Sequence, residues 1–232
     1  KYTGIVRLVI AVCDTTTGKV EVVQGVSADI TPGQPCFTPD GSGVVYTGWK
    51  HYPRKLGMIY CYHRPCSLFH TDIRSITASG DTAQSLVHTC ISADSTVARS
   101  ARFNPAGDRL VYLASTGLET HNGAIQLRAH AWTGVVEGLG TSRVVVDIVD
   151  YPDEETGFPG LFAGNLPGRC FLADYRCVVS TAWKSRQAVV VVDIESGAIS
   201  RLHDVSLALG SSAVEGGWND PQDCSTNVLD VV

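Results

Sequence analysis

The sequence predicts an all-β fold, a partial β-propeller of about three to four four-stranded antiparallel blades. Three observations predict it: a strand–turn–strand pattern that recurs about every 66 residues, a second recurring hairpin, and the near absence of helical periodicity in the 232 residues. The period is slightly above the about 40–50 residues of known blades. A sheet that recurs at such a period indicates a radial array.

The first recurring hairpin starts with an aromatic residue and contains a tight turn. Phe37–Tyr46 aligns without gaps on Phe103–Tyr112, and Phe171–Ser180 is a weaker third copy that lacks the Pro and the Gly. Pro39 fixes φ at a value suited to the second position of a turn, and the Asp-Gly after it supplies a polar side chain and a permissive backbone. Because β-branched residues follow, each copy is predicted to be two strands joined by a turn.

The second recurring element is a hairpin whose turn holds an Asp and, four residues later, a Gly. Asp14–Gly18 and Asp193–Gly197 both fit, and each leads within two residues to a β-branched side chain. The Asp can cap the turn, and the Gly can take the left-handed position. Degenerate versions are found at Leu68–Ile73 and Ala129–Val136. Two hairpins per unit give a four-stranded antiparallel sheet.

The predicted domain covers residues 1–232 as an incomplete ring. At this period the chain holds about three and a half units, whereas propellers close with about four to eight blades. The expected pieces are part of a blade at 5–26, blades at 35–80, 99–149 and 168–205, and the start of another at 216–232. Because an open arc leaves sheet edges unpaired, the segment in isolation is expected to be poorly soluble or partly disordered.

Composition narrows the functional classes. Hydrophobic residues make up 44% and charged residues 18%, which is typical of a globular protein. The net charge of −5 gives no support for binding nucleic acid or anionic membranes. No apolar run is long enough to span a membrane. The eight cysteines show no compact disulfide framework, which favours reduced thiols and a cytoplasmic location.

The stretch GWKHYPRKLG at Gly48–Gly57 is one that a generic propeller has no reason to contain. It is the most specific part of a region, from Ser27 to Tyr62, that resembles the propeller of animal acylamino-acid-releasing enzymes (acylpeptide hydrolases of the prolyl oligopeptidase class). Further matching stretches are Thr31–Gln34, Ser185–Asp193 and Gly216-Gly217-Trp218. The resemblance extends from near Val6 to near Trp218, which is most of the chain.

The resemblance implies a cytosolic serine hydrolase that removes an N-acylated residue from the amino end of short peptides. In this family a seven-bladed propeller covers a C-terminal α/β-hydrolase domain and restricts entry to small, unstructured peptides, and the enzymes form homo-oligomers. The chain is therefore expected to be the non-catalytic, substrate-gating part of such an enzyme. Its expected partners are the hydrolase domain, short N-acylated peptides and further copies of itself.

The sequence departs from the family in lacking a nucleophile motif. The hydrolase signature Gly-x-Ser-x-Gly is absent: Gly41-Ser42-Gly43 has the wrong spacing, and Gly210-Ser211-Ser212 also fails. We therefore expect no catalytic, cofactor-binding or metal-binding residue in 1–232, and expect the hydrolase domain to be absent from it. Two alternatives are a catalytically dead family remnant and a free-standing interaction scaffold, although such scaffolds often carry Trp-Asp repeats and here Asn219 follows Trp218.

Two histidine-containing stretches have both a functional and a structural interpretation. His51 could face an interior chamber, but an exposed loop is favoured because polar loops are exposed by default. Cys61, Cys66 and His70 could suggest zinc, but no second Cys pair completes a tetrahedral set at a usual spacing.

Three further features are predicted to be structural. The acidic stretch Asp150–Glu155 could attract a cationic peptide end, but a solvated connection between blades is favoured. Ser185-Arg186 could bridge to a partner domain, but residues of a hairpin turn are more often simply exposed. The recurring aromatic side chains could line a channel, although packing between blades explains them better; they are Phe37, Phe103 and Phe171.

Overall fold

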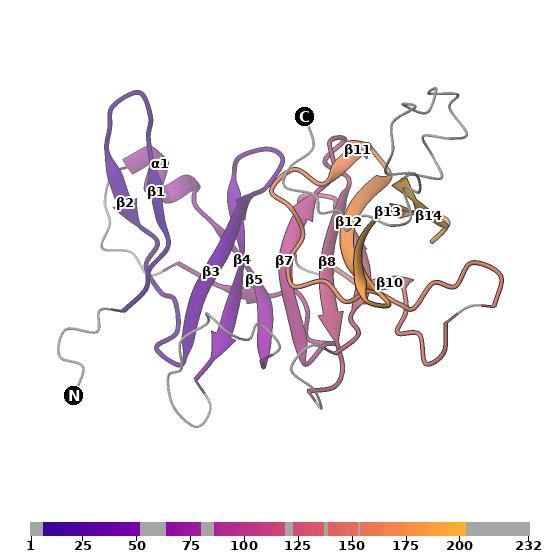
Figure 1. The fold of residues 1–232 in the computed structure, drawn as a ribbon. Coiled ribbons are helices and arrows are strands. Elements are labelled where there is room, and N and C mark those ends of the chain that lie inside the picture. The colour runs from indigo at the N-terminus through magenta and orange to yellow at the C-terminus, as the bar shows by residue number, and fades with distance from the viewer. Residues whose placement is uncertain are drawn as a thin grey trace.

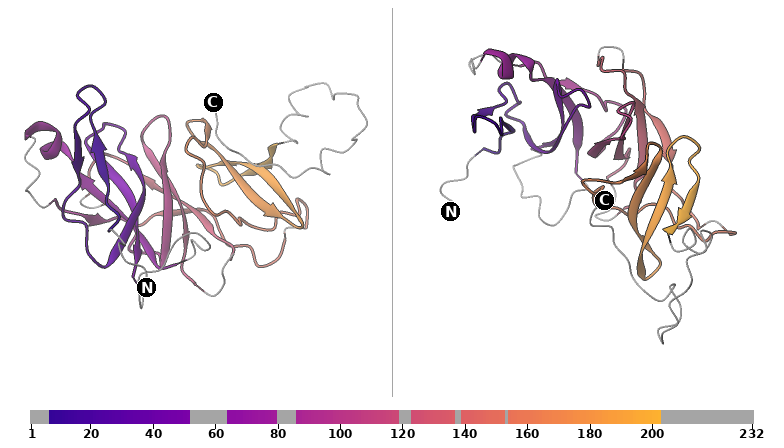
Figure 2. Two further views of the ribbon diagram at one scale, coloured as in Figure 1. Left: turned by 60° about the vertical axis from the view of Figure 1, so that its left-hand side comes forward. Right: turned by 90° about the horizontal axis from the view of Figure 1, so that it is seen from above.

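A computed structural model describes residues 7–51, 64–79, 86–118, 123–136, 139–152 and 154–202. Nearly all of its regular structure is strand, and successive segments of the chain lie beside one another in chain order (Figures 1 and 2). In the described residues, no helix is long and apolar enough to cross a membrane. The elements are β1 (Ala11–Cys13), β2 (Val20–Val22), β3 (Ile30–Phe37), β4 (Gly43–Lys50), β5 (Cys66–Asp72), α1 (Arg74–Ser79), β6 (Thr89–Cys90), β7 (Val97–Phe103), β8 (Arg109–Ser115), β9 (Gln126–Ala131), β10 (Arg143–Val146), β11 (Phe171–Ala173), β12 (Arg176–Trp183), β13 (Arg186–Asp193) and β14 (Ile199–Arg201).

The strands form successive antiparallel meanders, which confirms the predicted fold class. We call them blade A (β3 to β6), blade B (β7 to β10) and blade C (β11 to β14). Blades A and B touch edge to edge through one parallel pair, Cys66 with Val97, and the hairpin of β1 and β2 precedes blade A. Dividing the chain into blades at these bounds is our proposal, and the expected start of a blade at 216–232 lies outside the described residues.

The hydrophobic cores lie between the blades because successive side chains of a strand point to opposite faces of its sheet. On β8, Leu110 and Tyr112 belong to the cluster shared with blade A, whereas Val111 and Leu113 belong to the cluster shared with blade C. Side chains point to opposite faces at every second residue of a strand, so a strand buried on both faces is apolar without interruption. The hydrophobic run of β8 therefore packs against two sheets at once.

The recurring aromatic residues confirm the packing prediction at two positions and contradict it at the third. The ring of Phe103 packs edge-on against Trp132 with centroids 4.9 Å apart, and Phe171 packs against the core between blades B and C. Phe37 is instead 57% exposed. It pairs in register with Val44, whose face of blade A is covered by the short hairpin of β1 and β2. That hairpin covers Val44 but does not reach Phe37.

The two equivalent turn glycines give a matched test of blade stacking. Gly41 and Gly107 have φ values of 70° and 75°. A Cβ at Gly41 would meet nothing within 4 Å, but one at Gly107 would lie 2.8 Å from the Pro39 Cβ of blade A. We expect Gly41→Ala to cost about 1 kcal/mol of unfolding free energy through backbone strain. Gly107→Ala should cost about 2 kcal/mol or more because of the added overlap.

Urea denaturation of both variants measures the difference. Equal losses would mean that the two turns do not touch, which would contradict the stacking of blade B on blade A.

Candidate functional site: the bulged first strands

The first strands of blades A and B share the same irregularity. The register with the neighbouring strand shifts between Gly33 and Cys36 on β3 and between Arg99 and Arg102 on β7. Within these bulges Gln34 and Ser100, which are 66 residues apart, have positive φ values of 49° and 60°. A bulge re-aims a side chain that would otherwise follow the pleat. The repeat therefore places a polar side chain at the same point of blades A and B.

Hydrogen bonds join the bulge of each blade to the next. Gln34 Oε1 accepts the backbone N–H of Ser100 at 2.9 Å, and Ser100 Oγ accepts the backbone N–H of Leu166 at 2.8 Å. Leu166 lies a further 66 residues along the chain. Gln34 Nε2 also donates to Asn165 Oδ1 at 2.6 Å. The first strands of blades A and B therefore meet, and the first strand of blade B meets the segment before β11, as expected for the inner edge of a radial array.

Two arginines flank the bulge of β7 and hold the segment before β11. Arg99 Nε and Nη2 donate to the carbonyls of Gly164 and Ala163 at 2.9 and 3.1 Å. Arg102 Nε and Nη2 donate to the carbonyls of Pro167 and Leu166 at 2.7 and 3.0 Å. Arg99 is only 4% exposed. Two rigid guanidinium groups thus hold four backbone carbonyls of this segment across the seam between blades B and C.

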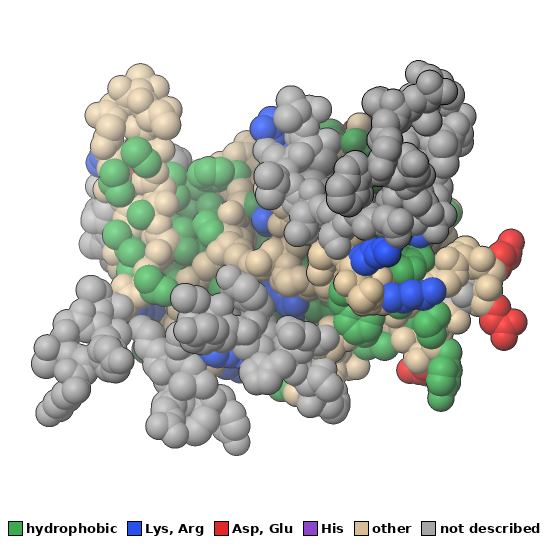
Figure 3. All heavy atoms as spheres, viewed as in Figure 1, with side chains coloured by type: hydrophobic (Ala, Val, Ile, Leu, Met, Phe, Trp, Pro, Cys, Tyr) green, Lys and Arg blue, Asp and Glu red, His purple; other side chains and the backbone are tan. Residues whose placement is uncertain are grey.

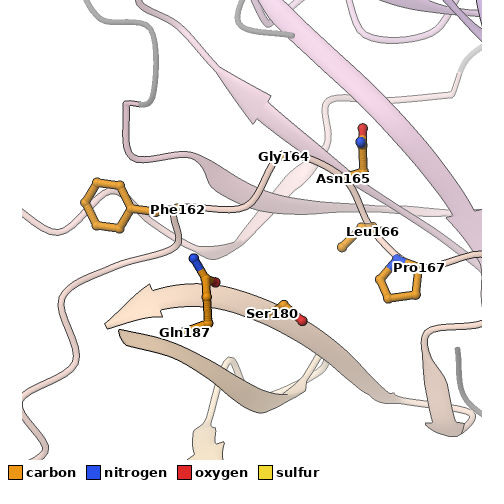
Figure 4. Close-up of a pocket in the computed structure, with 7 residues that line it drawn as sticks. All are labelled: Phe162, Gly164, Asn165, Leu166, Pro167, Ser180 and Gln187. Carbon is orange, nitrogen blue, oxygen red and sulfur yellow. The ribbon is translucent and has the colours of Figure 1, made fainter. Parts of the chain in front are cut away.

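The same segment borders a cavity of about 370 Å³ on blade C (Figure 4). Asn165 points away from the strands that carry Ser180 and Gln187, toward its hydrogen bond with Gln34. The groups around the bulges are amides, hydroxyls and guanidiniums, which bind carbonyls and amides and do not exchange protons near neutral pH. The cavity is lined by Phe162, Gly164, Asn165, Leu166, Pro167, Ser180 and Gln187.

A tyrosine–histidine pair links blade A to the hairpin before it. The Tyr46 hydroxyl lies 2.9 Å from His88 Nδ1, and His88 Nε2 lies 2.9 Å from the carbonyl oxygen of Gln24. Because a carbonyl only accepts, Nε2 carries the proton and Nδ1 accepts the Tyr46 hydroxyl. Burial raises the pKa of Tyr46 to about 12, so the hydroxyl remains a donor at neutral pH.

Blade B repeats this contact with blade A. Tyr112, 66 residues after Tyr46, stacks on His130, and His130 Nε2 lies 2.9 Å from the carbonyl oxygen of Ile91 next to β6. Burial lowers the pKa of His130. Asp94 favours its charged form and Arg128 opposes it, and these two side chains pair at 2.6 Å. The contact requires a proton on Nε2, and burial favours the neutral imidazole.

The lowered pKa of His130 predicts a loss of stability in acid. The unfolded chain takes up a proton on this imidazole near pH 6.5, whereas the folded chain resists it until a lower pH. The unfolded state therefore binds more protons in that window, and the free energy of unfolding should fall as the pH drops below about 6.5. His130→Gln keeps a donor for Ile91 and removes the titration.

Urea denaturation of the wild type and of His130→Gln at several pH values between 7 and 5 tests this. The difference between the two profiles isolates His130 from the other histidines. Parallel profiles would contradict the assignment of a neutral, buried imidazole.

The described histidine and cysteine candidates have structural contacts. His51 Nε2 lies 2.7 Å from Thr31 Oγ1, so the half-buried ring is held against β3. Cys66 is fully buried, and burial raises the pKa of its thiol to about 11, which disfavours the thiolate that binds metals. Cys61 lies outside the described residues. Among the described residues, no three His, Cys, Asp or Glu side chains are grouped to hold a metal.

The other two candidates lie at the surface of the described part. In the acidic stretch Tyr151 is 85% exposed and Glu155 borders a cavity beside blade C, whereas Asp153 lies outside the described residues. Ser185 and Arg186 are exposed where β12 turns into β13.

Sequence reasoning missed the bulge residues, although a signal was present. Gln34 and Ser100 each stand three residues before a recurring Phe, so aligning the repeats would have placed them at one position. The two positions are hard to match in the sequence because one side chain is an amide and the other a hydroxyl.

Comparison with known proteins agrees with this fold. The chain is 34% identical over 211 residues to the acylamino-acid-releasing enzyme of Mus musculus and 33% identical to that of Homo sapiens, in each case covering 90% of this chain and 26% of the relative. It thus spans about a quarter of the length of these curated relatives.

Solved structures show the same fold at low sequence identity. TolB from Acinetobacter baumannii matches with a TM-score of 0.51 and 17% identity, covering 84% of this chain and 37% of that one. A puromycin-hydrolyzing peptidase from Mycobacterium tuberculosis matches with a TM-score of 0.51 and 14% identity, covering 80% and 26%.

A protein-family model also matches this chain. The model described as "Acylamino-acid-releasing enzyme, N-terminal domain" matches residues 1–213. This range includes every described strand and both first-strand bulges. The chain therefore belongs to the acylamino-acid-releasing enzyme family and corresponds to its N-terminal domain.

Proposed function

We propose that the chain is the non-catalytic propeller part of a serine acylaminoacyl-peptidase, which releases N-acylated amino acids from short peptides. The observation that carries this proposal is the match of residues 1–213 to the N-terminal domain of the family. In this proposal the chain works in the cytoplasm against an α/β-hydrolase domain, limits which peptides reach it, and takes part in a homo-oligomer.

The contacts between blades support a gating role. A gate that selects by size has to keep its sheets from parting, because a gap between blades would admit larger chains. Gln34, Ser100 and the two arginines join the blades through charged or buried hydrogen bonds at their first strands. On β9 of blade B, His130 also contacts the carbonyl oxygen of Ile91 next to β6 of blade A. Blades A and B are thus joined at their first strands and again near β6.

The test compares short and long substrates in the full natural polypeptide. We expect hydrolysis of an N-acetylated dipeptide and little hydrolysis of an N-acetylated peptide of about 30 residues. The longer peptide has roughly three times as many residues as a long β-strand. Removing the bulge contacts with Gln34→Ala and Ser100→Ala should raise the relative rate on the longer peptide. Thr15→Ala, an exposed change in the turn between β1 and β2, is the control.

Two results would contradict the proposal. One is an unchanged ratio of long to short substrate in the double variant, provided that thermal melting shows it to be folded. The other is turnover of an acetyl-amino-acid chromogenic ester by residues 1–232 alone, since the proposal assigns these residues no catalytic group.

A further inference from the structure

A larger cavity, of about 690 Å³, lies beside blade C and has no role in the gating proposal. Trp183 and Phe158 form its apolar wall, with ring centroids 5.6 Å apart and less than a tenth of each side chain exposed. Ile199 adds an aliphatic surface, and Arg201 and Glu155 bring opposite charges. The volume lies within the about 300–1,000 Å³ of small-molecule sites, which are mostly apolar with a few placed polar groups.

Arg201 is positioned for a ligand that accepts hydrogen bonds. Its guanidinium carbon lies 4.9 Å from the centroid of the Trp183 ring, an arrangement that fixes the planar group over the aromatic face. Its Nε atom is buried and makes no hydrogen bond to the described residues. A buried donor without an acceptor is costly, and more so when it is charged. A carboxylate can satisfy such a group with two parallel hydrogen bonds.

The charges around the cavity favour a ligand with two charged ends. Glu155 is exposed at the end of the acidic stretch, and Arg201 is on β14; both line the cavity. On the face shown in Figure 3, basic side chains border an apolar area at the blade C end of the molecule, and acidic side chains project beyond it. A ligand with an anionic and a cationic end therefore meets complementary charge at both.

We propose that this cavity binds a short, unmodified peptide that ends in a large apolar residue. The terminal carboxylate pairs with Arg201, the last side chain packs on Trp183 and Phe158, and the free ammonium group faces Glu155. The proposal does not rest on the gating role, because it concerns a free carboxylate and a free amine, whichever reaction produces them.

The experiment is calorimetric titration of the full natural polypeptide with the dipeptide Leu-Phe, its C-terminal amide and its N-acetyl form. Leu-Phe should bind in a saturable manner, and the amide about tenfold more weakly because it lacks the carboxylate. Arg201→Gln should weaken the binding of Leu-Phe by about the same factor. Glu155→Gln should weaken the binding of Leu-Phe by about threefold and leave the affinity for the N-acetyl form unchanged.

The controls separate a lost contact from a lost fold. Arg176→Gln makes the same charge change at the far end of β12, where Arg176 pairs in register with Asp193, and it should bind like the wild type. Glu155 is exposed, so its variant keeps the fold even if Arg201→Gln does not. The proposal is overturned if Leu-Phe shows no saturable binding up to about 10 mM, if the acid and the amide bind equally, or if a folded Arg201→Gln binds like the wild type.

Discussion

Replacing Leu113 with Ala is expected to lower the free energy of unfolding by about 3 kcal/mol, within the range for a buried Leu that leaves a cavity. Leu113 is fully buried on β8 and faces the core that blade B shares with blade C. The same core cluster includes Val179 and Val190, which pair in register on β12 and β13. Because a sheet on each side fixes these side chains, the site cannot collapse to fill the gap.

Leu172→Ala is the matched control, since Leu172 is 52% exposed on β11. This substitution should change the free energy of unfolding by less than about 0.5 kcal/mol. Urea denaturation of the full natural polypeptide measures both. If Leu113→Ala costs no more than Leu172→Ala, blades B and C do not pack against one another at this position.

Replacing Arg99 with Met is expected to cost about 2–3 kcal/mol, because hydrogen bonds from a charged donor to two backbone carbonyls are lost. Met keeps much of the length and apolar stem of Arg, so the loss reports on the guanidinium. The carbonyls of Ala163 and Gly164, in the segment before β11, would be left without this donor. The backbone N–H of Leu166, which donates to Ser100, should then exchange faster with solvent.

Arg176→Met, a change on the exposed end of β12, controls for the loss of charge. Denaturation gives the free energy, and hydrogen exchange gives the protection of Leu166. An Arg99→Met variant as stable as Arg176→Met would refute the view that Arg99 holds the seam between blades B and C.

The repeat predicts the blades because each local signal has a direct backbone cause. The Pro-Asp-Gly turn at Pro39 closes with Gly41 at positive φ, and its counterpart closes the same way at Gly107. The apolar run on β8 indicates a strand buried on both faces, which is what stacked sheets require. Fold class and family could therefore be predicted from residues close together in the chain.

The contacts between blades could not be predicted in the same way. Gln34 and Ser100 meet across 66 residues, and whether either side chain reaches its neighbour depends on a bulge that has no sequence signature of its own. Phe37 shows the converse error, since repetition indicated a core position but the sheet that faces it is too short to cover it. The Arg201 cavity likewise depends on how β14 lies beside the segment that begins at Glu155.

The central claim is that consecutive four-stranded sheets stack as blades and that blades A and B meet through their bulged first strands. A crystal structure or an electron cryo-microscopy map of the full natural polypeptide tests it most directly. We expect blades A, B and C in succession around one axis, with the backbone nitrogen of Ser100 about 3 Å from the amide oxygen of Gln34. Helices packed on a parallel sheet, or one closed barrel without radial repetition, would contradict it.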